Sequence, residues 1–238
     1  MFLTNSSVSH RLTFYDHALK KQALNQPRHR VLSHFPDVPY NVIGIAASIG
    51  GLKAISTILS ALPPDFPAAI VVVQHLPPNN PSRMAEILSF HTSLIVKQAE
   101  NGELLRRGTV YTPTPNQHLL VNPDGTLSLS NSAKVNFARP AADKLFWSLA
   151  SSYKSRAIAV VLTGRMSDGA LGVLAVKRQG GIVIAQDENT AECFSMPKAA
   201  IDTKKVDQIL PVNLIAPALV SLVMDSKFLD KNFESMAV

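Results

Sequence analysis

Residues 41–51 read NVIGIAASIGG, an apolar run that ends at Ser48 and is followed by two glycines. Two similar β-branched runs come just before His75 and a few residues before Asp168. The three runs are residues 41–47 (NVIGIAA), 69–74 (AIVVVQ) and 157–163 (AIAVVLT). Continuous apolar runs of this length are typical of strands buried on both faces of a parallel sheet. Because ligands bind at the carboxyl ends of such strands, the sequence predicts that the hydroxyl, imidazole and carboxylate meet at one sheet edge.

Helical periodicity fills the gaps between these runs. The predicted fold is therefore α/β, with a doubly wound, mainly parallel sheet of the Rossmann-like, three-layer type. The expected helices cover residues 52–62, 80–90, 141–152, 169–179 and 212–224, with a short one opening at Met196-Pro197 and a further strand at 181–185. Asn80 and Pro81 supply an N-cap and a first-turn proline for the second of these helices.

Short alternating segments replace this pattern between residues 94 and 130. Two of them, 118–121 and 126–129, flank Asn-Pro-Asp-Gly at 122–125, which is a hairpin signal. Together with residues 109–112, they predict a small antiparallel hairpin insert at one edge of the sheet.

The size of the chain fits one folded domain between two extensions. Its 238 residues are 46% hydrophobic and 17% charged, as in globular proteins. We assign residues 41–224 to the domain, 1–40 to a flexible N-terminal extension and 225–238 to a loose C-terminal tail. The extension holds four of the seven histidines, but none is spaced with a cysteine or carboxylate as in a metal site.

Charge and composition argue against nucleic acid and membranes as partners. The net charge is +6, and half of it comes from the first 40 residues, which hold five basic and two acidic residues. The other basic residues are scattered, without the aromatic interleaving that stacks bases. No apolar stretch reaches the roughly 18 residues of a membrane span, and the N-terminus lacks the pattern of a secretory signal. The single cysteine, Cys193, can form no intrachain disulfide, so we infer a reducing cytoplasm.

Ser48 lies between a predicted strand and a predicted helix, where a serine can have two roles. It can be a nucleophile, with Gly50 and Gly51 allowing a tight turn and amides at the helix start stabilising an oxyanion. It can also be a helix cap, which is the commoner role for a serine there. The stretch is not the G-x-S-x-G elbow of α/β-hydrolases, because Ala46 replaces the first glycine. A dinucleotide-binding turn is disfavoured, since no acidic residue ends the second strand.

His75 and Asp168 also have structural alternatives: a polar residue where a strand meets water, and a helix N-cap. Their shared edge with Ser48 favours a catalytic set, in which the imidazole takes the hydroxyl proton and the carboxylate orients the imidazole. The chain order serine, histidine, aspartate differs from that of α/β-hydrolases and indicates another scaffold.

Six motifs, in this order, resemble the catalytic domain of the CheB family, the protein-glutamate methylesterases of bacterial chemotaxis. They are IGIAASIGG (43–51), VVVQHLPP (71–78), YTPTPNQHLLV (111–121), ARPAADKLF (138–146), VVLTGRMSDGALG (160–172) and AQDENTAECFSMPKAAI (185–201). The resemblance extends from about residue 42 to residue 223. It implies that Ser48 is the nucleophile, His75 the base and Asp168 the acid that orients the base.

The resemblance implies hydrolysis of glutamate methyl esters on methylated chemoreceptor cytoplasmic helices, with release of methanol and with glutamine deamidation as a related activity. Ser48 would form a glutamyl ester that water then cleaves, and no metal or organic cofactor is expected. Most members also carry an N-terminal receiver domain. About 40 residues are far fewer than a domain needs, so no covalently attached receiver is expected here. The alternative is a non-catalytic regulatory module that binds receptors through the same surface.

Two departures from the family pattern fall beside the expected site. Ile49 follows the serine where the family commonly has threonine, which removes a hydroxyl but leaves a backbone amide. The family's G-N-D-G becomes Met166-Ser-Asp-Gly, which enlarges the wall beside Asp168. We expect these changes to affect substrate fit more than acyl chemistry.

The remaining candidates are contacts rather than reacting groups. Oxyanion or substrate contacts are expected from Ile49, Gly50, Gly51, Met166 and Arg139. Arg139 would meet an acidic receptor segment, although an arginine at a helix start is more often only solvated. His118, in the predicted hairpin, and Cys193, without a basic neighbour, are expected to be structural.

Overall fold

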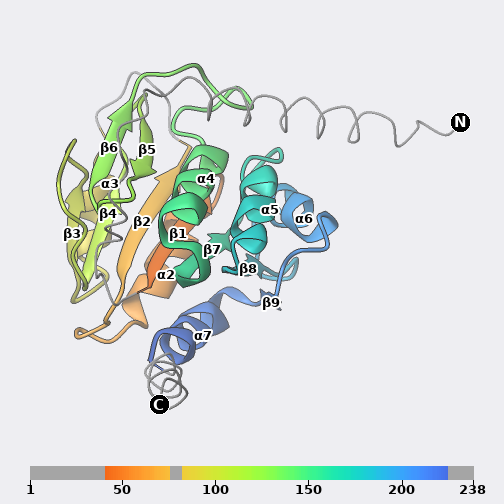
Figure 1. The fold of residues 1–238 in the computed structure, drawn as a ribbon. Helices are drawn as coiled ribbons and strands as arrows, with labels where there is room; N and C mark the ends of the chain where they lie inside the picture. The colour runs from red at the N-terminus through yellow and green to blue at the C-terminus, as the bar shows by residue number, and fades with distance from the viewer. Residues whose placement is uncertain (1–40, 76–81, 225–238) are drawn as a thin grey trace, which may run out of the picture. The chain divides into compact units, whose positions relative to one another are not determined.

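A seven-stranded sheet in the order β3-β4-β2-β1-β7-β8-β9 forms the middle layer of the domain (Figure 1). The computed structural model describes residues 41–75 and 82–224. The strands are β1 (Val42–Ala47), β2 (Ala69–Gln74), β3 (Ile95–Gln98), β4 (Thr109–Thr112), β7 (Ala157–Val161), β8 (Ile182–Gln186) and β9 (Gln208–Leu210). All neighbouring strands in this sheet run parallel, so the predicted doubly wound α/β class is confirmed.

Helices cover both faces of the sheet, because successive residues of its central strands are apolar on both sides. Val42 and Ala46 belong to the core shared with α4 (Ala142–Tyr153), α5 (Ala170–Arg178) and α6 (Ser195–Asp202). Ile43 and Ile45 belong to the core shared with α2 (Gly51–Ser60), α3 (Met84–Ser89) and α7 (Val212–Met224). A short 3-10 turn, η1 (Lys154–Arg156), leads from α4 into β7. None of the described helices is long and apolar enough to cross a membrane.

The central strand β1 lies between β2 and β7. Ala47 pairs with Gln74 of β2, and Ala46 pairs with Val161 of β7. The chain adds strands on one side of β1 first and crosses to the other side only at β7. The strand order therefore changes direction at β1, and the carboxyl ends of such strands are where α/β sheets bind ligands.

The predicted hairpin forms a separate two-stranded antiparallel sheet, β5 (His118–Val121) with β6 (Leu127–Ser130). It is joined to α4 by side chains: Val121 N–H donates to Ser148 Oγ (3.0 Å), and Ser152 Oγ donates to Val121 O (2.9 Å). Residues 109–112, which the sequence grouped with the antiparallel insert, are instead the parallel strand β4 of the main sheet. Alternation indicates an extended segment, but not its direction or its partner.

Smaller differences concern the ends of elements. The sequence does not predict the edge strands β3 and β9, which are only four and three residues long. Helix α3 begins at Met84, later than the predicted start near residue 81. The predicted cap Asn80, the extension 1–40 and the tail 225–238 lie outside the described residues.

Candidate active site

Ser48 and His75 each follow directly on the end of one of two neighbouring strands. His75 N–H donates to Ala47 O (3.1 Å), which continues the β1–β2 ladder by one step. Ser48 N–H donates to Thr163 O (3.0 Å) on the other side, just past the end of β7. The backbone thus places Ser48 between the ends of β2 and β7, at the sheet edge where the sequence predicts a site.

The turn after Ser48 depends on its two glycines. Gly50 has a φ of +73°, in the left-handed region that favours glycine, and is the N-cap of α2, so Ser48 is not that cap. A Cβ on Gly51 would overlap the side chains of Ala47 and Gln74. Gly51 N–H donates to Ser48 O (2.9 Å), and the expected contact of Gly51 with the oxyanion or substrate stays a prediction. Among the described residues, Ile49 N–H and Gly50 N–H donate no hydrogen bond.

A third glycine lets the segment after β7 approach the serine. An ideal Cβ on Gly164 would lie 2.8 Å from Ser48 Cβ and would overlap Met196 Sδ. The backbone of Cys193 holds this segment in place, since Gly164 N–H donates to Cys193 O (2.8 Å) and Cys193 N–H donates to Thr163 Oγ1 (2.8 Å). These are contacts of the Cys193 backbone, and a packing role for its half-buried side chain stays a prediction.

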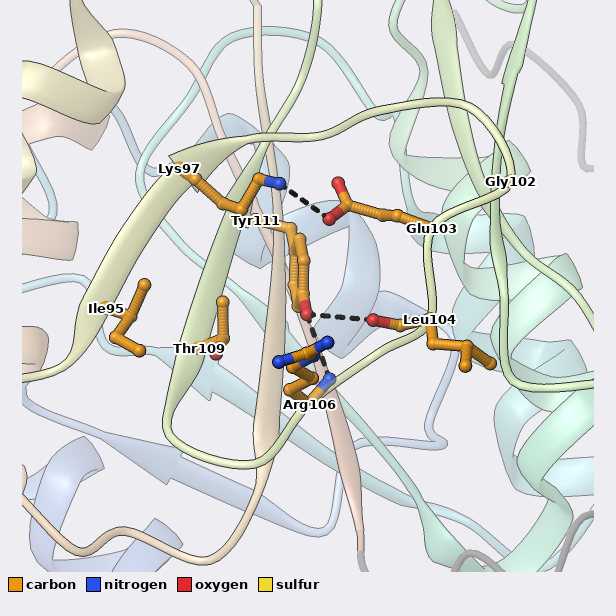
Figure 2. A pocket seen from close by; sticks show the side chains of 8 residues that line it. All are labelled: Ile95, Lys97, Gly102, Glu103, Leu104, Arg106, Thr109 and Tyr111. Carbon is orange, nitrogen blue, oxygen red and sulfur yellow. Dashed lines mark hydrogen bonds and ion pairs between the residues drawn. The ribbon is translucent and has the colours of Figure 1, made fainter.

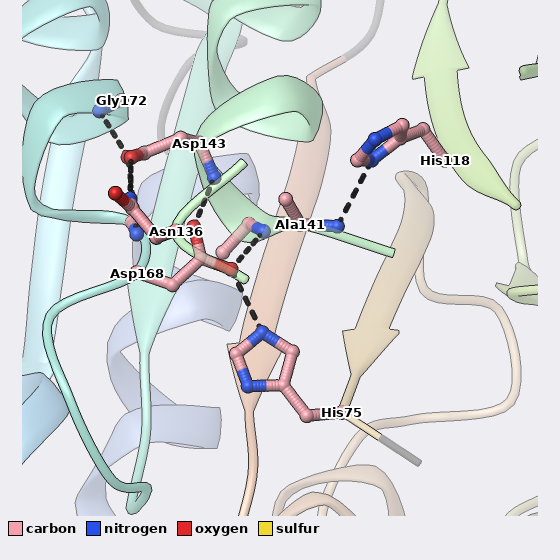
Figure 3. Close-up of polar contacts among 9 residues, drawn as sticks. His75, His118, Asn136, Ala141, Asp143, Asp168 and Gly172 are labelled. Carbon is pink, nitrogen blue, oxygen red and sulfur yellow. Dashed lines mark hydrogen bonds and ion pairs between the residues drawn. The ribbon is translucent and has the colours of Figure 1, made fainter. Parts of the chain in front are cut away.

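The Asp168 carboxylate is held at the start of α4. It is 2% exposed and accepts hydrogen bonds from Ala142 N–H (2.6 Å, to Oδ2) and Asp143 N–H (3.0 Å, to Oδ1). Oδ2 also contacts His75 Nε2 at 2.7 Å (Figure 3). The free amides and the positive end of the helix dipole stabilise a negative charge at this point. Asp168 is thus placed to orient His75, as expected for a carboxylate in a catalytic set.

The contact with Asp168 also determines which imidazole nitrogen can act as a base. An ionised carboxylate only accepts hydrogen bonds, so Nε2 carries the proton and Nδ1 of the neutral ring keeps its lone pair. The His75 side chain is 22% exposed, so water and substrate can reach it. Ser48 Oγ makes no hydrogen bond among the described residues. Catalytic hydrogen bonds often close only when substrate binds, so this contact stays a prediction.

A second buried carboxylate, Asp143, lies beside Asp168. It is 0% exposed, and its Oδ1 accepts from Gly169 N–H (3.0 Å) and Gly172 N–H (2.7 Å) at the start of α5. Burial, and then the charge of Asp168, raise the pKa of the Asp143 carboxyl from 3.8 to about 7, against the opposing effect of its hydrogen-bond donors. This group therefore changes charge near neutral pH.

We expect the raised pKa of Asp143 to make the folded state less stable as pH rises from about 4 to about 7. In this window the folded chain holds a proton on Asp143 that the unfolded chain has lost. Unfolding therefore releases a proton, and a rise in pH favours unfolding. Asp143→Asn lacks this titration. Urea unfolding of both proteins from pH 4 to 8 checks it: the stability of the wild type minus that of the variant should fall up to about pH 7 and then level off. A difference that rises with pH would contradict the assignment.

A cavity of about 180 Å³ opens beside the imidazole, and His75 and Asp168 line it. Its other lining residues include Lys134, Phe137 and Met166. Phe137 and Met166 are largely exposed, at 87% and 59%, and form an apolar rim. Ligand pockets for drug-sized molecules begin near 300 Å³, so this cavity suits a single side chain.

Arg139 lines the same cavity but is already occupied by hydrogen bonds. Its guanidinium donates to Asn116 Oδ1 from Nε (3.0 Å) and Nη2 (2.9 Å). Nη1 donates to Asn131 O (2.9 Å) and Ser132 O (3.1 Å). These contacts join two loops, so the structure gives Arg139 a structural role that the sequence did not predict. Its contact with an acidic substrate stays a prediction.

A larger cavity, of about 470 Å³, lies elsewhere, beside β3 and β4 (Figure 2). It is lined by Ile95, Lys97, Gly102, Glu103, Leu104, Arg106, Thr109 and Tyr111, which include none of the three predicted catalytic residues. The Tyr111 hydroxyl accepts from Arg106 N–H (2.9 Å) and donates to Leu104 O (3.3 Å), so it holds in place the loop that contains these two residues. The larger of these two cavities is therefore not the one that His75 and Asp168 line.

The sequence does not predict the residues that hold Asp168 and the starts of α4 and α5 in place. Asp143, Asn136 and Phe137 are not among the residues that the sequence predicts at the site. His118 is buried, as a structural residue should be, and its Nδ1 accepts from Ala141 N–H (3.2 Å), just before the amides that hold Asp168. The motif ARPAADKLF contains Asp143 in the first turn of a predicted helix, and that acidic position was the one available signal.

Comparison with known proteins identifies relatives over most of the described domain. The protein-family description "CheB methylesterase" matches residues 43–219. A protein of Leptospira interrogans is 40% identical over 183 residues, which are 77% of this chain and 95% of that protein. The "protein-glutamate methylesterase/protein-glutamine glutaminase of group 3 operon" of Rhizobium meliloti is 41% identical over 184 residues, and this chain covers 52% of it.

A solved structure supports the same relationship. The crystal structure of the CheB methylesterase catalytic domain of Thermotoga maritima matches with a TM-score of 0.75 and 40% sequence identity. The match covers 77% of this chain and 99% of that domain.

Proposed function

This chain belongs to the CheB methylesterase family and is a carboxylic ester hydrolase of its protein-glutamate methylesterase/protein-glutamine glutaminase type, and we propose that Ser48, His75 and Asp168 perform its reaction. The observation that carries the proposal is the 2.7 Å contact between His75 Nε2 and the buried Asp168 carboxylate. It lies at the sheet edge where the backbone brings Ser48 and His75 side by side. This combination supplies a base, its orienting acid and a hydroxyl at one sheet edge.

The reaction begins when His75 Nδ1 takes the proton of Ser48 as Oγ attacks the ester carbonyl. Asp168 keeps the imidazole in the tautomer that has its proton on Nε2 and stabilises the imidazolium ion. The tetrahedral intermediate collapses when the imidazolium donates its proton to the methoxy oxygen. Methanol leaves, and a glutamyl ester of Ser48 remains. Water, deprotonated by the same imidazole, then cleaves that ester and releases the glutamate carboxylate.

Backbone amides after Ser48 stabilise the oxyanion of both tetrahedral intermediates. Ile49 N–H and Gly50 N–H are the candidates from this turn, because neither donates to another described residue. Met166 N–H is a third, since it also donates to none of the described residues, and Met166 has a φ of +68° beside the cavity. Donors fixed in advance are effective because they need no rearrangement when negative charge develops.

The substrate in this proposal is a methylated glutamate on a cytoplasmic helix of a chemoreceptor, so the reaction takes place in the cytoplasm. The cavity of about 180 Å³ has room for one side chain, which fits an ester presented by a larger protein. The exposed rings and chains of Phe137 and Met166 offer apolar contacts around it, and Lys134 offers a positive charge for acidic neighbours on the helix.

Methanol release from a methylated receptor fragment tests the proposed function directly. The full chain should release methanol in proportion to the ester lost, and should release ammonia from a glutamine-containing fragment if the glutaminase activity is also present. A chain that binds the fragment but releases no methanol would contradict the proposal and favour the non-catalytic module.

A further inference from the structure

Asp143 is a buried carboxylate for which the proposed reaction has no use. Its Oδ1 accepts from Gly169 N–H and Gly172 N–H, and its Oδ2 accepts from Asn136 Nδ2 at 2.9 Å (Figure 3). A carboxylate in the interior is costly unless such donors hold it. Three donors from two separate segments therefore define its position.

Asp143 and Asp168 cap each other's helix. Asp168, just before α5, accepts from Ala142 N–H and Asp143 N–H at the start of α4. Asp143, in the first turn of α4, accepts from the amides at the start of α5. Each carboxylate satisfies helix amides that would otherwise be unpaired, and each is fixed by the opposite helix. The two helices cannot shift relative to one another without moving the carboxylate that contacts His75.

The same carboxylate anchors the turn at the rim of the cavity. Val135 and Ala138 exchange two backbone hydrogen bonds, of 3.1 and 2.9 Å, around Asn136 and Phe137. Both central residues have positive φ, of 49° and 64°, as in the tight turns that close hairpins. Because Asn136 donates to Asp143, the turn that carries the exposed Phe137 is tied to the helix pair.

We propose that Asp143 is a positioning residue for the hydrolysis, which holds Asp168 through the starts of α4 and α5 where Asp168 orients His75. The inference rests on the proposed function and acts at the same site. Among the described residues, the groups that face Asp143 are the Asp168 carboxylate, the α5 amides and the Asn136 amide, and its neighbour on α4 is Lys144.

Three variants test the proposal in the full chain: Asp143→Ala, Asp143→Asn and Ser152→Ala. The alanine removes both acceptor oxygens. The asparagine keeps one oxygen for the α5 amides, and a rotated Asn136 can accept from its new amide group. Ser152→Ala is the matched control, because Ser152 is a buried hydrogen-bonding residue at the far end of the same helix, where its Oγ donates to Val121 O. Methanol release and urea unfolding are measured for each.

Asp143→Ala should lower kcat by about 10- to 100-fold with little change in KM, which is the usual cost of displacing a catalytic group through its supporting residue. Asp143→Asn should recover most of that loss, and Ser152→Ala should keep wild-type kcat although it is less stable. A kcat within twofold of wild type for folded Asp143→Ala, or an equal loss in Ser152→Ala, would overturn the proposal.

If Asp143→Ala does not fold, the pH profile of Asp143→Asn is read in its place. Asp143 carries its negative charge mainly above about pH 7, where that charge favours the protonated imidazole. The kcat/KM of Asp143→Asn should therefore reach its plateau at a lower pH than that of the wild type, with the part of the acid limb well below pH 7 unchanged. A profile that superimposes on the wild type would overturn the proposal. Failure of the proposed function looks different, because the wild type itself would then release no methanol.

Discussion

Ser48→Ala should release methanol at least about 10⁴-fold more slowly than the wild type, because removing the nucleophile of a catalytic set costs nearly all of its acceleration. The hydroxyl makes no hydrogen bond among the described residues, so its loss should leave the fold intact. Initial rates of methanol release from the methylated receptor fragment, at matched folded fraction, measure the effect.

Ser195→Ala is the matched control for this prediction. Ser195 is exposed at the start of α6, and within the described residues its hydroxyl makes one weak contact, to Cys193 Sγ at 3.7 Å. It should keep wild-type turnover. If Ser48→Ala turned over as fast as Ser195→Ala, another group would have to be the nucleophile.

Asp168→Asn should be the second largest loss, of about 10⁴-fold in kcat, as for the comparable change in a serine protease. Three N–H donors converge on this carboxylate: Ala142 N, Asp143 N and His75 Nε2. The asparagine amide group must face at least one of them. If the NH2 group takes the place of Oδ2, which Ala142 N–H and His75 Nε2 share, the imidazole faces an N–H and takes the wrong tautomer for catalysis.

The pH dependence of that variant separates this cause from a general loss of structure. Asp168→Asn should unfold at a lower urea concentration than the wild type, because its amide group leaves a buried N–H donor unpaired, yet the variant that is still folded should stay nearly inactive across pH 6 to 9. Activity within tenfold of wild type would contradict the orienting role of Asp168.

The main sheet could be predicted because its central strands are unusually uniform. Val42–Ala47 and Ala69–Gln74 are buried on both faces, and continuous apolar runs record that environment in the sequence. The edge strands could not be predicted in the same way. Ile95–Gln98 has no fully buried residue, so nothing in its pattern distinguishes it from a loop, and the direction of Thr109–Thr112 depends on its partners.

The positions of Ser48, His75 and Asp168 could be anticipated because parallel strands end at one edge. Their supporting contacts could not. The pairing of Asp143 with the start of α5 and of Asp168 with the start of α4 links residues 25 to 29 positions apart, and it depends on how the two helices pack. The roles of Gly51 and Arg139 also depended on contacts that single positions do not reveal.

Active-site labelling with a fluorophosphonate tests the central claim most directly, since this reagent reports a serine hydroxyl made reactive by a neighbouring base. The wild type should be labelled on Ser48, as located by mass spectrometry of the peptide, and His75→Ala should lose the label while remaining folded. A wild type that releases methanol with Ser48 unlabelled, or equal labelling of Ser48 in His75→Ala, would contradict the account.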